Sequence, residues 1–184
     1  IHDCYTQDGD PVDIAPRQVL RRIMGMFRDR GLAPVVAPEI EFYLVKRNTD
    51  PDYPLEPPIG RSGRKETVRQ PYSMDAVDEF EPFIEDIYDY CEIQRLHVDN
   101  LAHESGTAQL EINFQHGDAV ELSDQMFLFK RTVRSMKEWA DQGVTIELSL
   151  IGAKAAAFFN SYGGNITSAV RDIGETPTLA DLIG

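Results

Sequence analysis

The chain has 184 residues, 42% of them hydrophobic, which suits one compact domain or two small ones and excludes a wholly disordered chain. Its 31 acidic and 18 basic residues give a formal charge of −13, which disfavours nucleic acid and anionic lipid as partners. Two cysteines are too few for a disulfide framework, and no apolar run approaches the ~20 residues that span a bilayer. The N-terminus lacks the features of a signal peptide. We therefore expect a cytoplasmic protein with no membrane insertion.

The first half of the chain predicts a helix, a strand and a long loop. Apolar residues at helical spacing predict a helix from about Pro16 to Arg30, and alternation predicts a strand from Val35 to Val45. Residues 48–72 are rich in proline and glycine and therefore predict a loop. A basic cluster in this loop indicates either a solvated segment or a lid for an anionic substrate: Arg61, Arg64, Lys65 and Arg69.

The second half predicts further helices and strands. One helix is expected from about Met74 to Leu96, with Cys91 as a core residue rather than a nucleophile. Two strands should flank the turn at residues 105–107. A third helix should start near Ser123 and continue past Trp139, and residues 144–150 alternate like a half-buried strand.

Four glutamates lie on the polar faces of the expected strands: Glu39, Glu41, Glu104 and Glu111. Alternate residues of a strand point to the same side, so Glu39 and Glu41 share a face. Enclosed like charges repel and lose hydration, and a hard divalent cation such as Mg²⁺ or Mn²⁺ offsets both costs. The pattern is typical either of a solvated strand face or of a metal site, with His97 and His103 as nearby nitrogen donors.

Two separated motifs carry a resemblance to a known family. Residues 38–44 read Pro-Glu-Ile-Glu-Phe-Tyr-Leu, and residues 103–114 read His-Glu-Ser-Gly-Thr-Ala-Gln-Leu-Glu-Ile-Asn-Phe. They resemble the first metal-binding strand and the second acidic segment of glutamine synthetases. Residues 60–64 and 129–134 are similar to the gamma-glutamylputrescine (polyamine) synthetase branch of that family, and the resemblance covers about residues 1–134.

This resemblance implies an ATP-dependent ligase. Members activate glutamate with ATP as gamma-glutamyl phosphate, which an amine or ammonia then attacks, with Mg²⁺ or Mn²⁺ neutralising the phosphates. By position, Glu41, Glu104 and Glu111 would hold the ion on the glutamate side, and Glu39 would help hold the ion between the ATP phosphates. The family's histidine metal ligand, substrate arginines and final catalytic glutamate have no counterpart after Arg134, so we expect weak metal binding and no turnover from this chain alone.

The last part of the chain carries a different resemblance. Residues 136–144, 151–154, 158–165 and 177–184 resemble the bacterial ATP synthase gamma subunit. The sequence therefore predicts two parts, a partial glutamine synthetase catalytic domain over 1–134 and a gamma-subunit-like segment over 135–184, joined in a chimera. The alternatives to a ligase fragment are an ATP synthase stalk fragment or a chimera without activity.

The expected fold class is α+β, with antiparallel strands and packed helices followed by a short α/β segment. We also expect self-association, because strands taken from a larger sheet expose apolar faces and unpaired edges. The apolar faces in question carry six side chains: Ile40, Phe42, Leu44, Leu110, Ile112 and Phe114.

Overall fold

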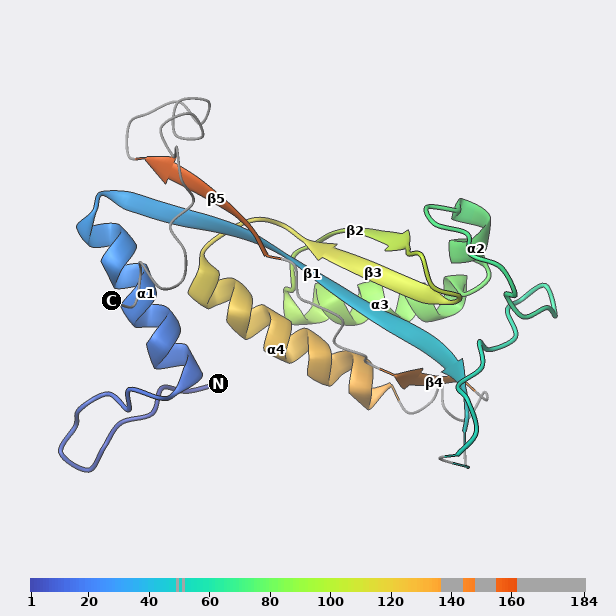
Figure 1. The fold of residues 1–184 in the computed structure, drawn as a ribbon, viewed down its shortest axis with the longest axis horizontal. Helices are drawn as coiled ribbons and strands as arrows, with labels where there is room; N and C mark the ends of the chain where they lie inside the picture. Colours follow the sequence, from blue (N-terminus) through green and yellow to red (C-terminus); the bar gives the residue numbers. More distant parts are fainter. Residues whose placement is uncertain (49, 51, 137–143, 148–154, 162–184) are drawn as a thin grey trace. The chain divides into compact units, whose positions relative to one another are not determined.

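The computed structural model describes residues 1–48, 50, 52–136, 144–147 and 155–161, the last two ranges through their backbone alone. The expected mixture of helices and antiparallel strands is confirmed (Figure 1). In chain order the elements are α1 (Pro16–Asp29), β1 (Leu32–Lys46), α2 (Met74–Asp78), α3 (Glu81–Gln94), β2 (Val98–His103), β3 (Gln109–Phe114), α4 (Ala119–Ser135), β4 (Val144–Glu147) and β5 (Ala155–Ser161).

A five-stranded sheet has β1 at its centre. The strand order is β2-β3-β1-β4, with β5 also paired to β1. Strand β1 is antiparallel to β3, and this register places Ile40 opposite Ile112 and Glu41 opposite Glu111. Strands β2 and β3 form the antiparallel hairpin that the sequence predicts around residues 105–107.

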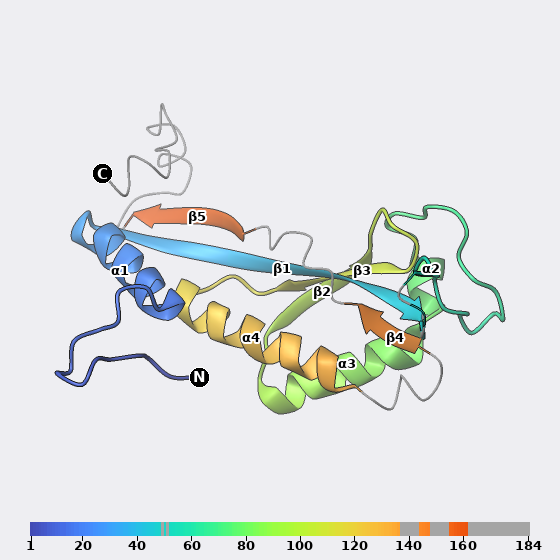
Figure 2. The same cartoon turned by 60° about the horizontal axis from the view of Figure 1, so that its bottom comes forward.

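Helices α3 and α4 cover one face of the sheet (Figures 1 and 2). The apolar residues of β1 and β3 alternate with polar ones, so a single face of each strand meets these helices. In the core, Phe83 contacts Phe42 edge to face at 6.2 Å between ring centres, and Phe129 contacts Phe114 at 5.1 Å. All six apolar strand residues that we expected to need external cover are buried by the chain itself. That reason for self-association is therefore wrong.

The helix predicted from Met74 to Leu96 is two helices, α2 and α3. Phe80, with φ −120° and ψ 21°, interrupts the helical backbone, and α3 begins directly before Pro82. A proline has no N–H, and its ring clashes with the carbonyl group four residues earlier, here that of Asp78. A regular continuous helix is disfavoured at this position, so the break follows from a proline inside the predicted range.

Helix α4 begins four residues before the predicted start at Ser123. The backbone N–H of Val120 donates to Asp118 Oδ1 at 2.9 Å, so an aspartate cap begins the helix early. The expected continuation past Trp139 lies outside the described residues. Most of the segment that resembles the gamma subunit also lies outside them.

Two compact units divide the chain. One contains residues 1–36, 118–120 and the chain from 157 onward, and the other contains 37–117 and 121–156. In the first unit, Asp3 forms ion pairs with Arg17 and Arg21 of α1. The second unit contains the hairpin and all four predicted site glutamates. Among the described residues, no helix is long and apolar enough to span a bilayer.

Candidate functional site

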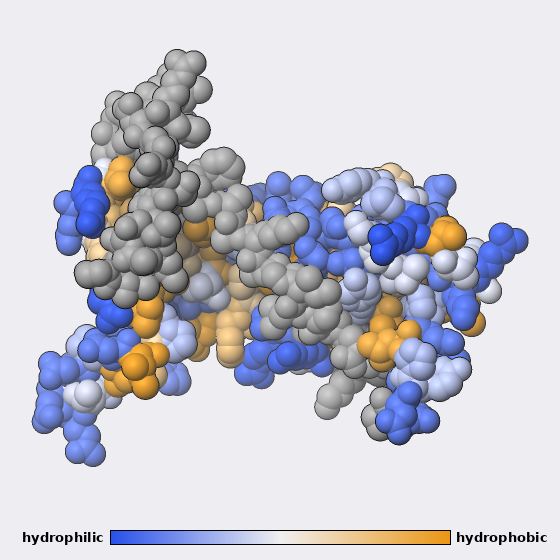
Figure 3. Space-filling view, viewed as in Figure 1, coloured by the Kyte–Doolittle hydropathy of each residue, from blue (hydrophilic) through white to orange (hydrophobic). Residues whose placement is uncertain are grey.

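The four predicted glutamates gather on the face of the sheet opposite α3 and α4, which we call the carboxylate face. Glu39 and Glu41 alternate with the buried residues of β1, and Glu111 lies directly opposite Glu41 on β3. Glu104 directly follows the last residue of β2. All four side chains are partly exposed. The visible atoms over β2 and β3 on this face are mostly hydrophilic (Figure 3).

Mutual repulsion among these carboxylates acts on Glu111. Burial raises the pKa of Glu111 most, and the charges of Glu104, Glu39 and Glu41 raise it further. A hydrogen bond from the amide of Asn113 to Glu111 Oε1, 3.0 Å long, acts in the opposite direction. The three other glutamates therefore lie within electrostatic reach of Glu111, and a cation among them would be attracted.

A hydrogen-bond network joins this face to the turn between β2 and β3. Gln109 is buried, and its Nε2 donates to Glu41 Oε2 at 2.8 Å. Gln109 Oε1 accepts from the backbone N–H of Gly106 at 2.7 Å and from the Tyr43 hydroxyl at 2.9 Å. The side chain of Gln109 thus fixes the Glu41 carboxylate relative to the turn that follows Glu104.

Neither histidine named as a nearby donor belongs to the carboxylate face. His103 is fully buried, and its Nε2 lies 3.0 Å from Glu66 Oε2. It faces the helices, because it pairs with the buried Leu110 in the hairpin. His97 precedes β2, at the opposite end of that strand from Glu104, and is exposed. Although both are near the glutamates in sequence, neither histidine is placed as a donor beside them.

Sequence reasoning missed Glu66, which lies in the basic loop. Its side chain is 7% exposed and contacts both His103 and the backbone of Ala108. Our prediction considered only the basic cluster of this loop. Two members of the cluster are paired with nearby carboxylates, since Arg61 pairs with Glu81 and Lys65 lies 3.8 Å from Glu56.

The donor set of the carboxylate face suits a hard cation, although the ligands are not drawn together. Carboxylate oxygens are the donors that Mg²⁺ and Mn²⁺ prefer, and their repulsion at Glu111 would be relieved by a positive ion. In the described part of the chain, however, no group of three or more His, Cys, Asp and Glu side chains is close enough to hold a metal ion as it stands. The chemistry of the residues fits a metal, and the side chains would have to converge on it.

Cys91 is a core residue, as predicted. It is 1% exposed in α3, and burial raises the pKa of its thiol to about 11. A thiol that stays protonated is a poor nucleophile. Cys91 therefore has no part in the chemistry of the carboxylate face.

Comparison with known proteins gives a consistent answer. The family profile described as "Glutamine synthetase, catalytic domain" matches residues 13–151. The gamma-glutamylputrescine synthetase PuuA of Escherichia coli (strain K12) is 40% identical over 134 residues, which are 72% of this chain. This chain spans only 28% of the length of that relative.

Solved structures share the fold. A GmaS/ADP complex in its conformation 1 has a TM-score of 0.66 at 19% identity, over 89% of this chain and 37% of that one. A glutamine synthetase of Plasmodium falciparum has a TM-score of 0.62 at 17% identity, over 79% and 32%. Because the family profile covers well over half of the sequence, the chain belongs to the glutamine synthetase catalytic-domain family.

Proposed function

We propose that this chain contributes to an ATP-dependent ligase that joins glutamate to an amine through a gamma-glutamyl phosphate. The observation that supports it most is the gathering of four glutamates on one sheet face, where burial raises the pKa of Glu111 and the charges of the other three raise it further. The relationship to gamma-glutamylputrescine synthetase supports an amine rather than ammonia as acceptor. ATP, glutamate and the amine are the substrates of this proposal.

Mg²⁺ or Mn²⁺ is the proposed cofactor. Glu41, Glu104 and Glu111 would hold one ion, and Glu39 would contribute to a second. Such ions neutralise phosphate charge when bound. Residues of this chain already position two of these ligands. Gln109 donates a hydrogen bond to Glu41, Asn113 donates one to Glu111, and the pairing of β1 with β3 fixes the backbone of both strands.

Calorimetric titration with Mn²⁺ tests the metal site. Glu41→Ala and Glu111→Ala should each weaken binding by at least about tenfold, because each removes a charged oxygen ligand. Glu85→Ala is the matched control, since Glu85 is an exposed carboxylate on α3. Equal Mn²⁺ affinity in the wild type and all three variants would refute the site.

Turnover needs a separate assay. With ATP, Mn²⁺, glutamate and putrescine, we expect no glutamate-dependent phosphate release from this chain alone, because catalysis requires ions and both substrates fixed together. Phosphate release that disappears in Glu111→Ala would show that the chain, or an oligomer of it, forms a working site. Hydroxylamine in place of putrescine reports the activated glutamate directly.

Self-association and a cytoplasmic location remain proposals. The outer edge of β2 is the edge of the described sheet order and offers backbone groups for pairing. Sedimentation velocity over a range of concentrations tests this proposal, and a monomer at every concentration would refute it. Cys4 and Cys91 are free, which suits a reducing compartment.

The division at residue 134 is likewise a proposal. The gamma-subunit-like assignment of 135–184 rests on sequence resemblance, whereas the match to glutamine synthetases runs to residue 151 and overlaps it. The two assignments differ in what should follow Arg134 in the source gene. A reading frame that continues as a glutamine synthetase would refute the division.

A further inference from the structure

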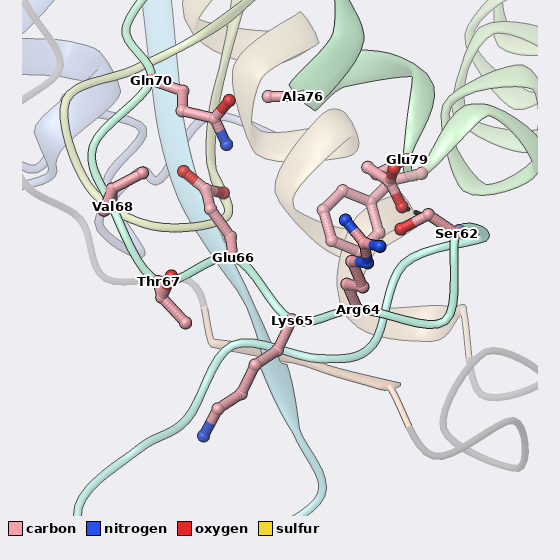
Figure 4. Close-up of a pocket in the computed structure, with 10 residues that line it drawn as sticks. Ser62, Arg64, Lys65, Glu66, Thr67, Val68, Gln70, Ala76 and Glu79 are labelled. Carbon is pink, nitrogen blue, oxygen red and sulfur yellow. Dashed lines mark hydrogen bonds between the residues drawn. The ribbon is translucent and has the colours of Figure 1, made fainter.

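Glu66 is a buried carboxylate in an otherwise exposed stretch of loop. Its side chain is 7% exposed, whereas its neighbours Lys65 and Thr67 are exposed. In Figure 4 the Glu66 carboxylate points toward the Gln70 amide, and the Lys65 side chain points the opposite way. Removing a carboxylate from water is unfavourable unless hydrogen bonds replace its hydration. The position of Glu66 therefore depends on the partners that it finds inside the fold.

Those partners are the two ends of the turn between β2 and β3. Glu66 Oε2 accepts a hydrogen bond of 2.7 Å from the backbone N–H of Ala108 and lies 3.0 Å from His103 Nε2. On the other side of the ring, His103 Nδ1 is 2.8 Å from the carbonyl oxygen of Glu104. A carbonyl oxygen can only accept, so Nδ1 carries a proton and donates. One carboxylate oxygen thus connects Ala108, His103 and the backbone of Glu104.

Ala108 shows that this connection holds an unusual backbone. Its φ of +52° is rare for a residue with a Cβ. Its N–H is bound by Glu66, and its carbonyl oxygen accepts from the N–H of Leu44 in β1 at 2.9 Å. Conformations of this kind persist where the surroundings fix them, and they gather at functional sites.

The second oxygen of Glu66 indicates that stability alone does not explain the residue. Glu66 Oε1 is buried and has no hydrogen-bond partner. An unpartnered buried oxygen reduces stability. A residue that reduces stability through one oxygen while it fixes a turn through the other is typical of a functional position.

We propose that Glu66 is a positioning residue that sets where Glu104 presents its carboxylate. His103 and Glu104 are consecutive, so the buried imidazole and the Glu104 side chain point to opposite sides of the hairpin. Fixing the ring and the Glu104 carbonyl group fixes the backbone that carries this carboxylate, whose charge already acts on Glu111. The inference rests on the proposed function, because it assigns Glu66 a role in the metal-binding set.

Mn²⁺ titration of the whole chain tests the proposal with three variants. Glu66→Ala should weaken Mn²⁺ binding about tenfold or more, which is typical when a group that orients a metal ligand is removed. Glu66→Gln should recover part of this loss, because its amide oxygen can still accept from the N–H of Ala108. Glu79→Gln is the matched control: it removes a carboxylate from the same pocket, one that binds Ser62 N at 3.0 Å instead of the turn (Figure 4).

Two further measurements separate positioning from a merely structural role. Hydrogen exchange should quicken in the peptide that covers residues 104–109 of Glu66→Ala, and in the N–H of Leu44 that donates to Ala108, but remain unchanged in α4. At saturating Mn²⁺, the electron paramagnetic resonance spectrum of Glu66→Gln should differ from that of the wild type, which a loss of stability alone would not cause.

The possible results are distinct. If the wild type binds Mn²⁺ and both Glu66 variants bind it with the same affinity, the positioning role is overturned and the proposed function stays intact. A wild type that binds no Mn²⁺ overturns the proposed function and the role of Glu66 with it. If Glu66→Ala fails to fold, the affinity and spectrum of Glu66→Gln decide, and wild-type values for both would overturn the inference.

Discussion

Gly106→Ala tests whether the turn between β2 and β3 is as tightly packed as the hydrogen bonds indicate. A Cβ atom at residue 106 would lie 2.5 Å from the Tyr43 hydroxyl oxygen and 2.6 Å from Gln109 Oε1. These two atoms are hydrogen-bonded to each other, and Gln109 Oε1 also accepts from the N–H of Gly106. A methyl group therefore cannot enter without breaking at least one of the two bonds.

The expected cost follows from these contacts. Forcing a group into a packed site costs about 1–3 kcal/mol, and a lost hydrogen bond costs about 1 kcal/mol. Since the two effects share the same displacement, we expect a loss of roughly 2 kcal/mol, which lowers the melting temperature of a chain of this size by about 4–8 °C. Mn²⁺ affinity should fall as well, because Gln109 also holds Glu41.

Thermal unfolding followed by circular dichroism is the assay. Gly117→Ala is the matched control, because the nearest atom to its added Cβ would be Leu122 Cδ1 at an ordinary 3.6 Å. The control should change stability by less than about 0.5 kcal/mol. Equal melting temperatures for Gly106→Ala and Gly117→Ala would refute the reasoning.

Three other substitutions and reactions have clear expected outcomes. Gly25→Ala in α1 should raise the free energy of unfolding by about 0.5–1 kcal/mol in urea titration, because its Cβ meets nothing closer than Arg28 Nη2 at 4.0 Å; a loss of stability would contradict this. Phe129→Ala should cost about 3–5 kcal/mol in the same titration, because the side chain is fully buried against Phe114; a change below 1 kcal/mol would contradict it. At pH 8, iodoacetamide should modify exposed Cys4 in the folded protein and reach Cys91 only after unfolding, as checked by mass spectrometry, because burial raises the pKa of Cys91 to about 11. Equal labelling of both thiols in the folded state would be evidence against that burial.

The strands and the carboxylate face were predictable from the sequence because both depend on a period of two. Ile40, Phe42 and Leu44 alternate with Glu39 and Glu41, so burying the apolar set forces the glutamates to the other face. The hairpin required only a glycine turn between two alternating segments. The local sequence pattern was therefore sufficient to predict that three strand segments place four carboxylates on one surface.

Two of the remaining errors arise where tertiary contacts decide, and one is local. The alternation of β2 could not show that His103 would be buried beside Glu66, because the partner is 37 residues away in a loop without periodicity. The break at Phe80 has a local cause in the sequence, Pro82. We predicted one helix because apolar residues at helical spacing lie on both sides of the break. The cover over the strands was misjudged because the sequence does not say which elements pack against the sheet.

Glu111→Gln tests the electrostatics of the carboxylate face, and its sign can be worked out. The pKa of Glu111 is raised in the folded chain, first by burial and then by the charges of Glu104, Glu39 and Glu41. A folded protein that raises a carboxyl pKa favours the protonated form. The stability linked to this group is therefore fully present below its unfolded pKa, about 4.3, and is lost as the pH rises through the higher folded value.

Glutamine cannot ionise, and its amide oxygen can still accept the hydrogen bond that Asn113 donates to Glu111 Oε1. Without divalent metal, Glu111→Gln should therefore be more stable than the wild type in urea at pH 7, and the difference should shrink as the pH is lowered toward 5. Excess Mn²⁺ should reverse the order, because a bound ion stabilises the folded wild type and the variant has lost a ligand. A variant that is less stable by the same amount at pH 5 and pH 7 would show that Glu111 acts through packing rather than charge. A stability order that Mn²⁺ leaves unchanged would instead remove Glu111 from the proposed metal site, while the repulsion among the four carboxylates would still stand.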